Sequence, residues 1–177
     1  MNLLDMLMDQ NNSAAIGEIA KQFNLDQNQT QNALGQIVPA LAKGLQNNAA
    51  QGGLGDLMSA LGSGDHQRYL DDPSTLSGEE GIQDGNNILG QILGSKDVSR
   101  QVASQAAAQT GLDAGMLKQM LPMIASMAMG VMSKNAASSG MAGNASDMAG
   151  MLTGLLDADK DGSVVDDLMG MAGKFFR

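Results

Sequence analysis

The chain has 177 residues with 10 basic and 19 acidic side chains, which give a net charge of −9 at pH 7. Two segments account for this charge: residues 65–84 have a net charge of −5 and residues 157–167 a net charge of −4. The rest of the chain is neutral, so no broad basic surface is available for nucleic acid or an anionic membrane. The absence of cysteine excludes disulfides, thiolate nucleophiles and cysteine-ligated zinc.

Composition predicts an all-α protein. Aromatic residues make up only 2% of the chain and β-branched residues are few, which argues against a sheet. Leu, Ala and 15 Met supply the apolar bulk for a core. We expect a multi-helix domain followed by a small C-terminal helix–loop–helix, divided into residues 1–62 (N-terminal helical segment), 63–85 (acidic loop or linker), 86–135 (second helical segment packing with the first), 136–146 (flexible linker) and 147–177 (helix–loop–helix).

The N-terminal segment predicts two capped helices. Ser13 can cap a helix over residues 14–23, and Asp26 can cap the next one. Pro39 lies inside the second apolar pattern and is expected to kink it or to start a new segment.

The acidic segment that follows, residues 63–85, contains Pro73 and several Gly and Ser residues and is predicted to be an exposed loop or a linker with one turn of helix. We interpret its single histidine, His66, as solvated, because no second His or Cys exists to complete a metal site. Glu79 and Glu80 could form a carboxylate pair for glycoside hydrolysis, but adjacent acids in such a segment are more often only solvated.

The second helical segment predicts three helices. The first ends at Gly94, Ser95 or Asp97 starts the second, Gly111 ends the second, and Asp113 caps the third. The third contains Pro122 and a run of methionines at helical spacing, which we interpret as core in preference to a groove for a partner helix. Its longest apolar stretch, residues 120–132, is too short to span a bilayer, and the N-terminus lacks a signal-peptide pattern, so we expect a cytoplasmic protein.

The two helical segments also share a sequence pattern. Each has a helix, a Leu-Asp pair (Leu25-Asp26 and Leu112-Asp113), an amphipathic stretch and a proline followed by apolar residues. Similar amphipathic helices also arise by chance, so the pattern leaves a duplication open.

The sharpest motif lies near the C-terminus. Asp157, Asp159 and Asp161 alternate before Gly162 and Ser163, as in the first half of an EF-hand calcium loop, where alternate side chains and one backbone carbonyl converge on the ion. The second half departs from the pattern, because position 12 is Leu168 in place of Glu. The predicted metal ligands are therefore Asp157, Asp159, Asp161, Ser163 and one of Asp166 and Asp167. Helix capping by Ser163 with Asp166 is the alternative, and the two uses are compatible.

Several stretches give the chain a family resemblance: residues 90–100, 110–113, 117–123, 157–163, 166–170 and Phe175. With these stretches the chain resembles the bacterial domain-of-unknown-function 937 family over most of its length, most strongly from Asn86 onward. The resemblance implies a bacterial source and a helical fold and supplies no reaction. Members of the family commonly carry Gly where Lys160 stands, so the lysine would weaken the ion site.

These observations favour a non-enzymatic binding or assembly module with Ca²⁺ as its cofactor. A protein partner or a second copy would bind through Met/Ala-rich helix faces, with no nucleic acid and no transmembrane segment. The alternatives are a self-associating helical protein without metal and a hydrolase that uses the acids of residues 65–84. The sequence leaves open the biological role, the partner, the oligomeric state and whether the loop holds calcium, another ion or none.

Overall fold

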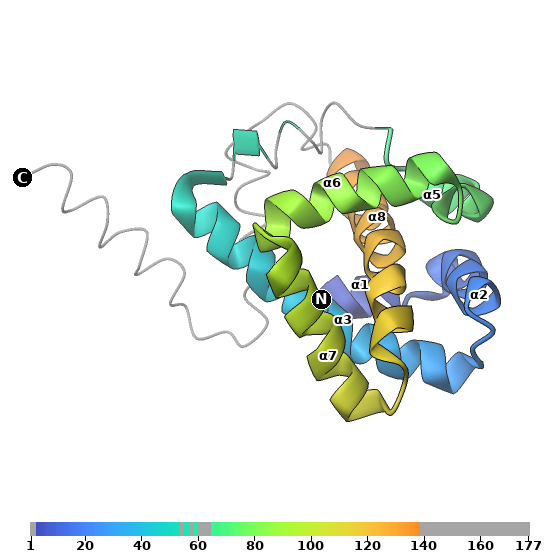
Figure 1. The fold of residues 1–177 in the computed structure, drawn as a ribbon. Helices are drawn as coiled ribbons and strands as arrows, with labels where there is room; N and C mark the ends of the chain where they lie inside the picture. The colour runs from blue at the N-terminus through green and yellow to red at the C-terminus, as the bar shows by residue number, and fades with distance from the viewer. Residues whose placement is uncertain (1–2, 54, 57–58, 60–64, 139–177) are drawn as a thin grey trace, which may run out of the picture.

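The computed structural model describes residues 3–53, 55–56, 59 and 65–138. This part of the chain is helical and contains no strand, which confirms the all-α prediction for the described residues (Figure 1). In chain order its elements are α1 (Leu3–Leu7), η1 (Gln10–Asn12), α2 (Ser13–Gln22), α3 (Gln27–Asn48), η2 (Ala49–Gly53), α5 (Arg68–Asp71), η3 (Pro73–Leu76), α6 (Glu79–Leu93), α7 (Lys96–Thr110) and α8 (Ala114–Ser138).

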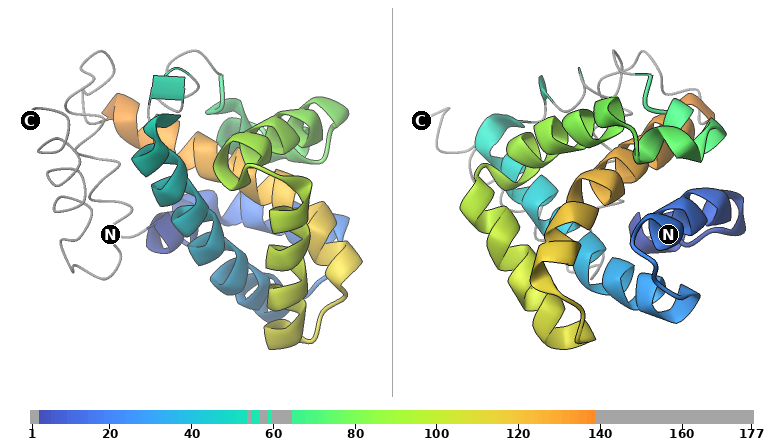
Figure 2. Two further views of the ribbon diagram at one scale, coloured as in Figure 1. Left: turned by 60° about the vertical axis from the view of Figure 1, so that its left-hand side comes forward. Right: turned by 45° about the vertical axis from the view of Figure 1, so that its right-hand side comes forward.

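Helix α8 runs through the centre of this body. It packs most extensively against α6 and α7, and α3 closes the opposite side by contacting both of these helices and α8 (Figure 2). Every residue from Met120 to Met132 is buried, so this helix has no solvent-facing stripe over these residues. A helix that is apolar all round needs neighbours on all sides, which is the arrangement that the surrounding helices provide. The methionines from Met120 to Met132 are therefore core residues, as their spacing predicted, and Met116 packs against the core from a half-buried position.

The predicted helix boundaries are confirmed where they depend on local hydrogen bonds. Asp26 forms a capping box with Gln29: its carboxylate accepts from the Gln29 backbone N–H at 2.8 Å, and the Gln29 side chain accepts from the Asp26 N–H at 3.0 Å. Ser95 caps α7 by accepting from the Val98 N–H, and the Asp113 carboxylate accepts from the Met116 N–H at 2.8 Å. These caps satisfy donors that a helix start otherwise leaves open.

The sequence pattern shared by the two helical segments has a local structural counterpart. A residue with positive φ ends each preceding helix, Asn24 (φ 52°) in one case and Gly111 (φ 74°) in the other. Each is followed by a half-buried Leu and by the Asp that caps the next long helix. The two connections thus share a residue with positive φ followed by Leu and Asp, and both lead into a long helix that contains a proline.

One prediction about a helix start was wrong. Asn12, not Ser13, precedes α2, and the Asn12 amide donates to the Met6 carbonyl at 2.7 Å instead of capping the helix. Neither proline ends its helix: α3 continues through Pro39 and α8 through Pro122. A proline costs a helix one hydrogen bond and a steric conflict with the preceding turn. Tertiary packing compensates for that cost, because α3 and α8 line the core on either side of these residues.

The prediction of an exposed loop over residues 63–85 was also wrong for residues 65–85. They form α5, η3 and the first half of α6, and their side chains Tyr69 and Leu76 are fully buried. Asp72 caps η3 by accepting from the Ser74 N–H at 3.2 Å, with Pro73 at its first position. The Gly and Ser residues of this segment do not form a linker: Ser77 follows η3, Gly78 precedes α6, and Gly81 and Gly85 lie inside α6.

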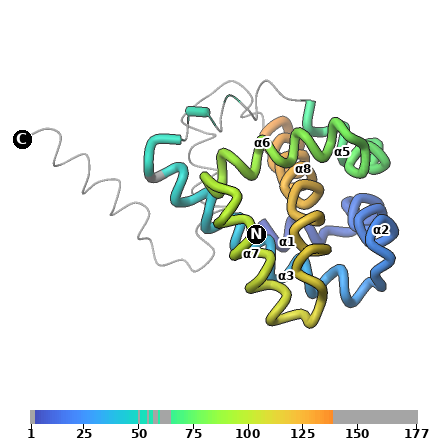
Figure 3. Tube along the Cα trace, viewed as in Figure 1, coloured from blue at the N-terminus to red at the C-terminus, as the bar shows by residue number. Residues whose placement is uncertain are grey.

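Parts of the chain far apart in sequence lie together in this body, as the trace in Figure 3 shows. Helix α3 contacts α6 and α7, which joins the first helical segment to the second. Residues 136–138, predicted to begin a linker, are the last residues of α8. The rest of that linker and the predicted helix–loop–helix of residues 147–177 lie outside the described residues.

Candidate functional site

The first candidate site is a polar cluster around Tyr69, made of His66, Arg68, Tyr69, Glu80 and Asp84 (the Tyr69 cluster). The Tyr69 hydroxyl donates to Oδ2 of Asp84 at 2.7 Å and accepts from Nη2 of Arg68 at 2.9 Å. The Arg68 guanidinium lies 4.9 Å from the centre of the Tyr69 ring and 3.5 Å from the Glu80 carboxylate. The cluster therefore ties α5 to the first turns of α6 through groups that bind one another.

Burial changes the acidity of this tyrosine. Desolvation raises the pKa of Tyr69 above its ordinary value, and the hydrogen bond and negative charge of Asp84 raise it further, against the opposing effect of Arg68. The hydrogen bond to Tyr69 in turn raises the pKa of Arg68. Tyr69 is thus held as a neutral hydroxyl and Arg68 as a cation, which suits a structural tether better than a proton donor poised for catalysis.

His66 was predicted to be solvated, and this prediction was wrong: the residue is only 6% exposed. Its ring stacks on Tyr69 with a centroid distance of 6.2 Å, and Nδ1 lies 3.6 Å from Oδ2 of Asp84. The backbone carbonyl of His66 faces Gly130 of α8, where a Cβ atom would come within 2.7 Å of it. The close approach to α8 buries His66, and sequence spacing alone did not reveal it.

Glu79 and Glu80 are both exposed, as their position in sequence suggested. Neither lines either of the two cavities described below. The hydrolase alternative, which expects these carboxylates to line a pocket, stays a prediction.

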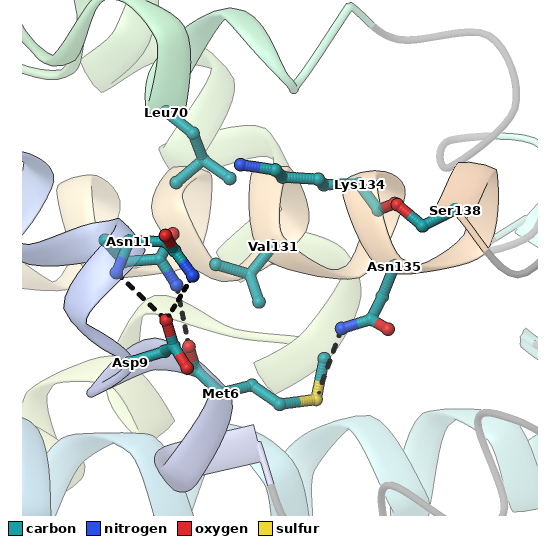
Figure 4. A pocket seen from close by; sticks show the side chains of 9 residues that line it. Met6, Asp9, Asn11, Leu70, Val131, Lys134, Asn135 and Ser138 are labelled. Carbon is teal, nitrogen blue, oxygen red and sulfur yellow. Dashed lines mark hydrogen bonds between the residues drawn. The ribbon is translucent and has the colours of Figure 1, made fainter.

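One cavity, of about 230 Å³, lies between η1 and the last turns of α8 (Figure 4). Asp9 and Asn11 face it from one side, and Lys134 and Asn135 from the other. Its polar groups are largely engaged locally, because Asp9 accepts from the backbone and side chain of Asn11 at 2.9 and 2.6 Å. These bonds form the cap of η1. We therefore interpret the polar side chains of this small cavity as structural groups at the start of η1, where it packs against α8.

The second cavity, of about 650 Å³, lies where α6 ends, α7 begins and both pass α8 (the basic cavity). Its lining is basic and polar at the rim and apolar at the base: Asn86, Leu89, Gly90, Gly94, Ser95, Lys96, Ser99, Arg100, Lys118 and Leu121. Leu89 and Leu121 are buried, whereas the three cations are exposed. Among the described residues that line it, none is acidic.

The tertiary fold assembles these cations. Lys96 and Arg100 lie four residues apart on α7, which places them on one face of the helix, and Lys118 comes from the neighbouring turns of α8. Gly94 makes the turn between α6 and α7 with φ 72°, a conformation that glycine adopts without strain. This site was not predicted from the sequence. The spacing of Lys96 and Arg100 within α7 was the single local signal, and Lys118 comes near them only because α8 packs against α7.

The predicted metal ligands Asp157, Asp159, Asp161, Ser163, Asp166 and Asp167 lie outside the described residues. Within residues 3–53, 55–56, 59 and 65–138, no group of three or more His, Cys, Asp or Glu side chains is placed to hold a metal ion. In the same part of the chain, no helix combines the length and apolar character that a bilayer crossing requires.

Comparison with known proteins supplies one match. Residues 5–135, more than half of the chain, match the family described as "Bacterial protein of unknown function (DUF937)". The resemblance was expected to be strongest from Asn86 to the end, but the match stops at residue 135 and does not include the Asp-rich loop. No curated protein and no solved structure matches the chain significantly.

Proposed function

The chain belongs to DUF937, a bacterial family of unknown function, and from that starting point we propose that the protein is a non-enzymatic binding module. In this proposal the basic cavity binds an acidic ligand, and the Asp-rich loop of residues 157–167 binds calcium. The partner surface lies at the basic cavity and not on the methionine face of α8, because that face is buried in the core.

The observation that carries the proposal is the charge of the basic cavity. The protein has a net charge of −9, yet Lys96, Arg100 and Lys118 gather around one cavity that has no acidic residue among its described lining. Like charges at an exposed site repel one another, so an arrangement of three cations gains from an anionic ligand. The volume of about 650 Å³ falls in the range of small-ligand and side-chain sites.

A nearby acid reduces this charge only in part. Nη1 of Arg100 lies 2.7 Å from Oδ1 of Asp97, on the same face of α7. Both side chains are more than half exposed, and an exposed pair of this kind contributes about 1 kcal/mol or less. A ligand carboxylate can therefore replace Asp97 at little cost, while Lys96 and Lys118 keep their charges available.

The non-enzymatic part of the proposal is supported by how the polar side chains are used. Tyr69, Arg68 and Asp84 bind one another, and none of them lines either of the two cavities described above. The basic cavity supplies cations, a hydroxyl and apolar surface, a set suited to holding an anion. Recognition of acidic groups by a cluster of cations is a recurrent binding mode.

Binding at the basic cavity is tested with a fluorescent glutamate-rich peptide and the full chain, measured by fluorescence anisotropy at low and high salt. The triple variant Lys96→Gln, Arg100→Gln, Lys118→Gln is expected to weaken binding about tenfold or more, because it removes the three cations. The matched control Lys21→Gln, Lys43→Gln, Lys134→Gln removes the same charge elsewhere on the surface and should bind as the wild type does. Equal loss in both variants would show that only net charge matters and would contradict the proposal.

Calcium binding is tested by calorimetric titration of chelator-stripped protein. We expect binding in the micromolar to millimolar range, weakened by Leu168 at the position where an EF-hand has Glu. The variant Asp159→Ala, Asp161→Ala should abolish the heat, because two of the alternating ligands are gone. The absence of heat from the wild type at millimolar calcium would refute the calcium site and leave the cavity proposal standing.

A further inference from the structure

We infer that the acidic ligand of the basic cavity is a phosphorylated small molecule, bound by its phosphate group to Lys96, Arg100 and Lys118. This inference rests on the proposed function, because it names the chemical class of the ligand for that cavity. The donors in the lining and the small extent of the positive charge favour a compact, highly charged group. The open wall along α6 provides room for the molecule that carries it.

The polar side chains of the lining are mainly hydrogen-bond donors. Lys96, Arg100 and Lys118 donate and have no acceptor. The Ser95 hydroxyl accepts from the Val98 N–H at 3.3 Å, a bond that does not use its own proton. A phosphate monoester offers three acceptor oxygens and about −1.5 to −2 charges at pH 7. A carboxylate has two oxygens and a single charge, so it satisfies fewer of these donors.

The guanidinium of Arg100 suits a phosphate in particular. Its Nη1 donates to Asp97 at 2.7 Å, and because a guanidinium has five N–H donors, a further edge remains for two oxygens of one phosphate group. The Asp97 side chain is 82% exposed, so its ion pair with Arg100 is weak and does not hold the arginine away from the cavity.

The positive charge is confined to the cavity, which favours a ligand with its charge in one place. The protein as a whole has a net charge of −9, and Asp97 lies directly beside Arg100. An acidic peptide spreads its charges over about 3.3–3.6 Å per residue, so part of it extends beyond the three cations and is repelled. Nucleic acid needs a longer basic surface still. A single phosphate group meets the cations without this repulsion.

The wall that α6 contributes leaves room for the ligand. Gly90 lines the cavity, and a Cβ atom added there would meet nothing within 4 Å. The same holds for Gly94, at the turn into α7. These two positions without side chains keep the cavity open. A charged side chain at Gly90 would therefore lie at the cavity without disturbing the packing of the core.

Titration of ¹⁵N-labelled full chain with phenyl phosphate, phenyl sulfate and benzoate tests the inference by NMR. The three probes share a ring and differ in their anionic group. At about 0.01 M salt, where charges are little screened, phenyl phosphate should bind about tenfold more tightly than either of the others, because it has the highest charge. Its shift changes should centre on residues 94–100 and on Lys118. Equal affinities, or shift changes centred elsewhere, would overturn the inference.

Two pairs of variants locate the phosphate group. Gly90→Asp should bind phenyl phosphate at least tenfold more weakly than Gly90→Ala, because the carboxylate offsets the cations while the methyl group changes only the shape. Lys118→Gln should bind it about fivefold more weakly than Lys21→Gln, which removes the same charge from a lysine outside the cavity. Because Lys118 is exposed, this second pair does not depend on how Gly90→Asp folds. The same affinity within both pairs would contradict binding at this cavity.

The fluorescent glutamate-rich peptide separates failure of this inference from failure of the proposed function. If the peptide binds through the three cations and phenyl phosphate does not displace it, the cavity takes acidic ligands but the phosphate assignment fails. If neither probe binds, the proposed function itself fails. A phosphoserine peptide that binds about tenfold more tightly than phenyl phosphate would show that the ligand is a phosphorylated protein, and would overturn the assignment to a small molecule.

Discussion

At the scale of single residues, Tyr69 shows how a polar side chain can be fully buried and still stabilise the fold. Its side chain projects from α5 and is fully buried, and its hydroxyl is satisfied on both sides, by Arg68 as donor and Asp84 as acceptor. Burying a hydroxyl without such partners would cost about 1–3 kcal/mol. The same surroundings that satisfy the hydroxyl disfavour its ionised form.

The tyrosine titration is directly measurable, because Tyr69 is the single tyrosine of a chain without tryptophan. We expect its tyrosinate absorbance to appear at a pH above the ordinary tyrosine pKa of about 10. Since the folded state then holds a proton that the unfolded state releases, the free energy of unfolding should fall as the pH rises above about 10. In the variant Tyr69→Phe that fall should disappear, and stability at neutral pH should drop by about 1 kcal/mol. A tyrosinate signal at the pH of a free tyrosine in the folded protein would contradict the assigned burial.

At the scale of elements, local signals predicted the helix boundaries well. Asp26, Ser95, Gly111 and Asp113 act within one turn of their own position, so the sequence around them is enough to define a cap or an αL ending. The helical, partly buried structure of residues 65–85 was not predicted, because Tyr69 becomes buried only when α5 packs on α8. This contact joins residues far apart in sequence. The basic cavity was missed for the same reason, since Lys118 joins the α7 cations only in the folded chain.

The contact between α6 and α8 depends on glycines that let two backbones approach. A Cβ atom added at Gly85 would lie within 2.7 Å of the Cα of Pro122 and would also strike its carbonyl group. Gly85→Ala is therefore expected to destabilise the protein by about 2 kcal/mol or more, because a backbone cannot yield as a flexible side chain can. The measurement is denaturant unfolding followed by circular dichroism.

Gly90 in the same helix supplies the matched control. Nothing lies within 4 Å of a Cβ atom added there, so Gly90→Ala should stabilise the protein by about 0.5–1 kcal/mol through helix propensity alone. Equal effects of the two substitutions would contradict the close approach of α6 and α8.

At the scale of the whole molecule, the charges are separated. Residues 65–84 and 157–167 account for the net charge of −9, whereas Lys96, Arg100 and Lys118 gather at one cavity with no acidic residue in its described lining. An anionic ligand at that cavity would meet cations on a protein whose net charge otherwise repels it.

The burial of α8 on all sides also sets the order in which the body can form during translation. Helices α3, α6 and α7 turn their apolar faces toward α8, yet the ribosome makes α8 after all of them. Until residues 120–132 have been synthesised, no central helix covers those faces, and they remain in contact with water. Nascent chains shorter than this point expose the future core and are the form of the protein most open to aggregation and to capture by chaperones.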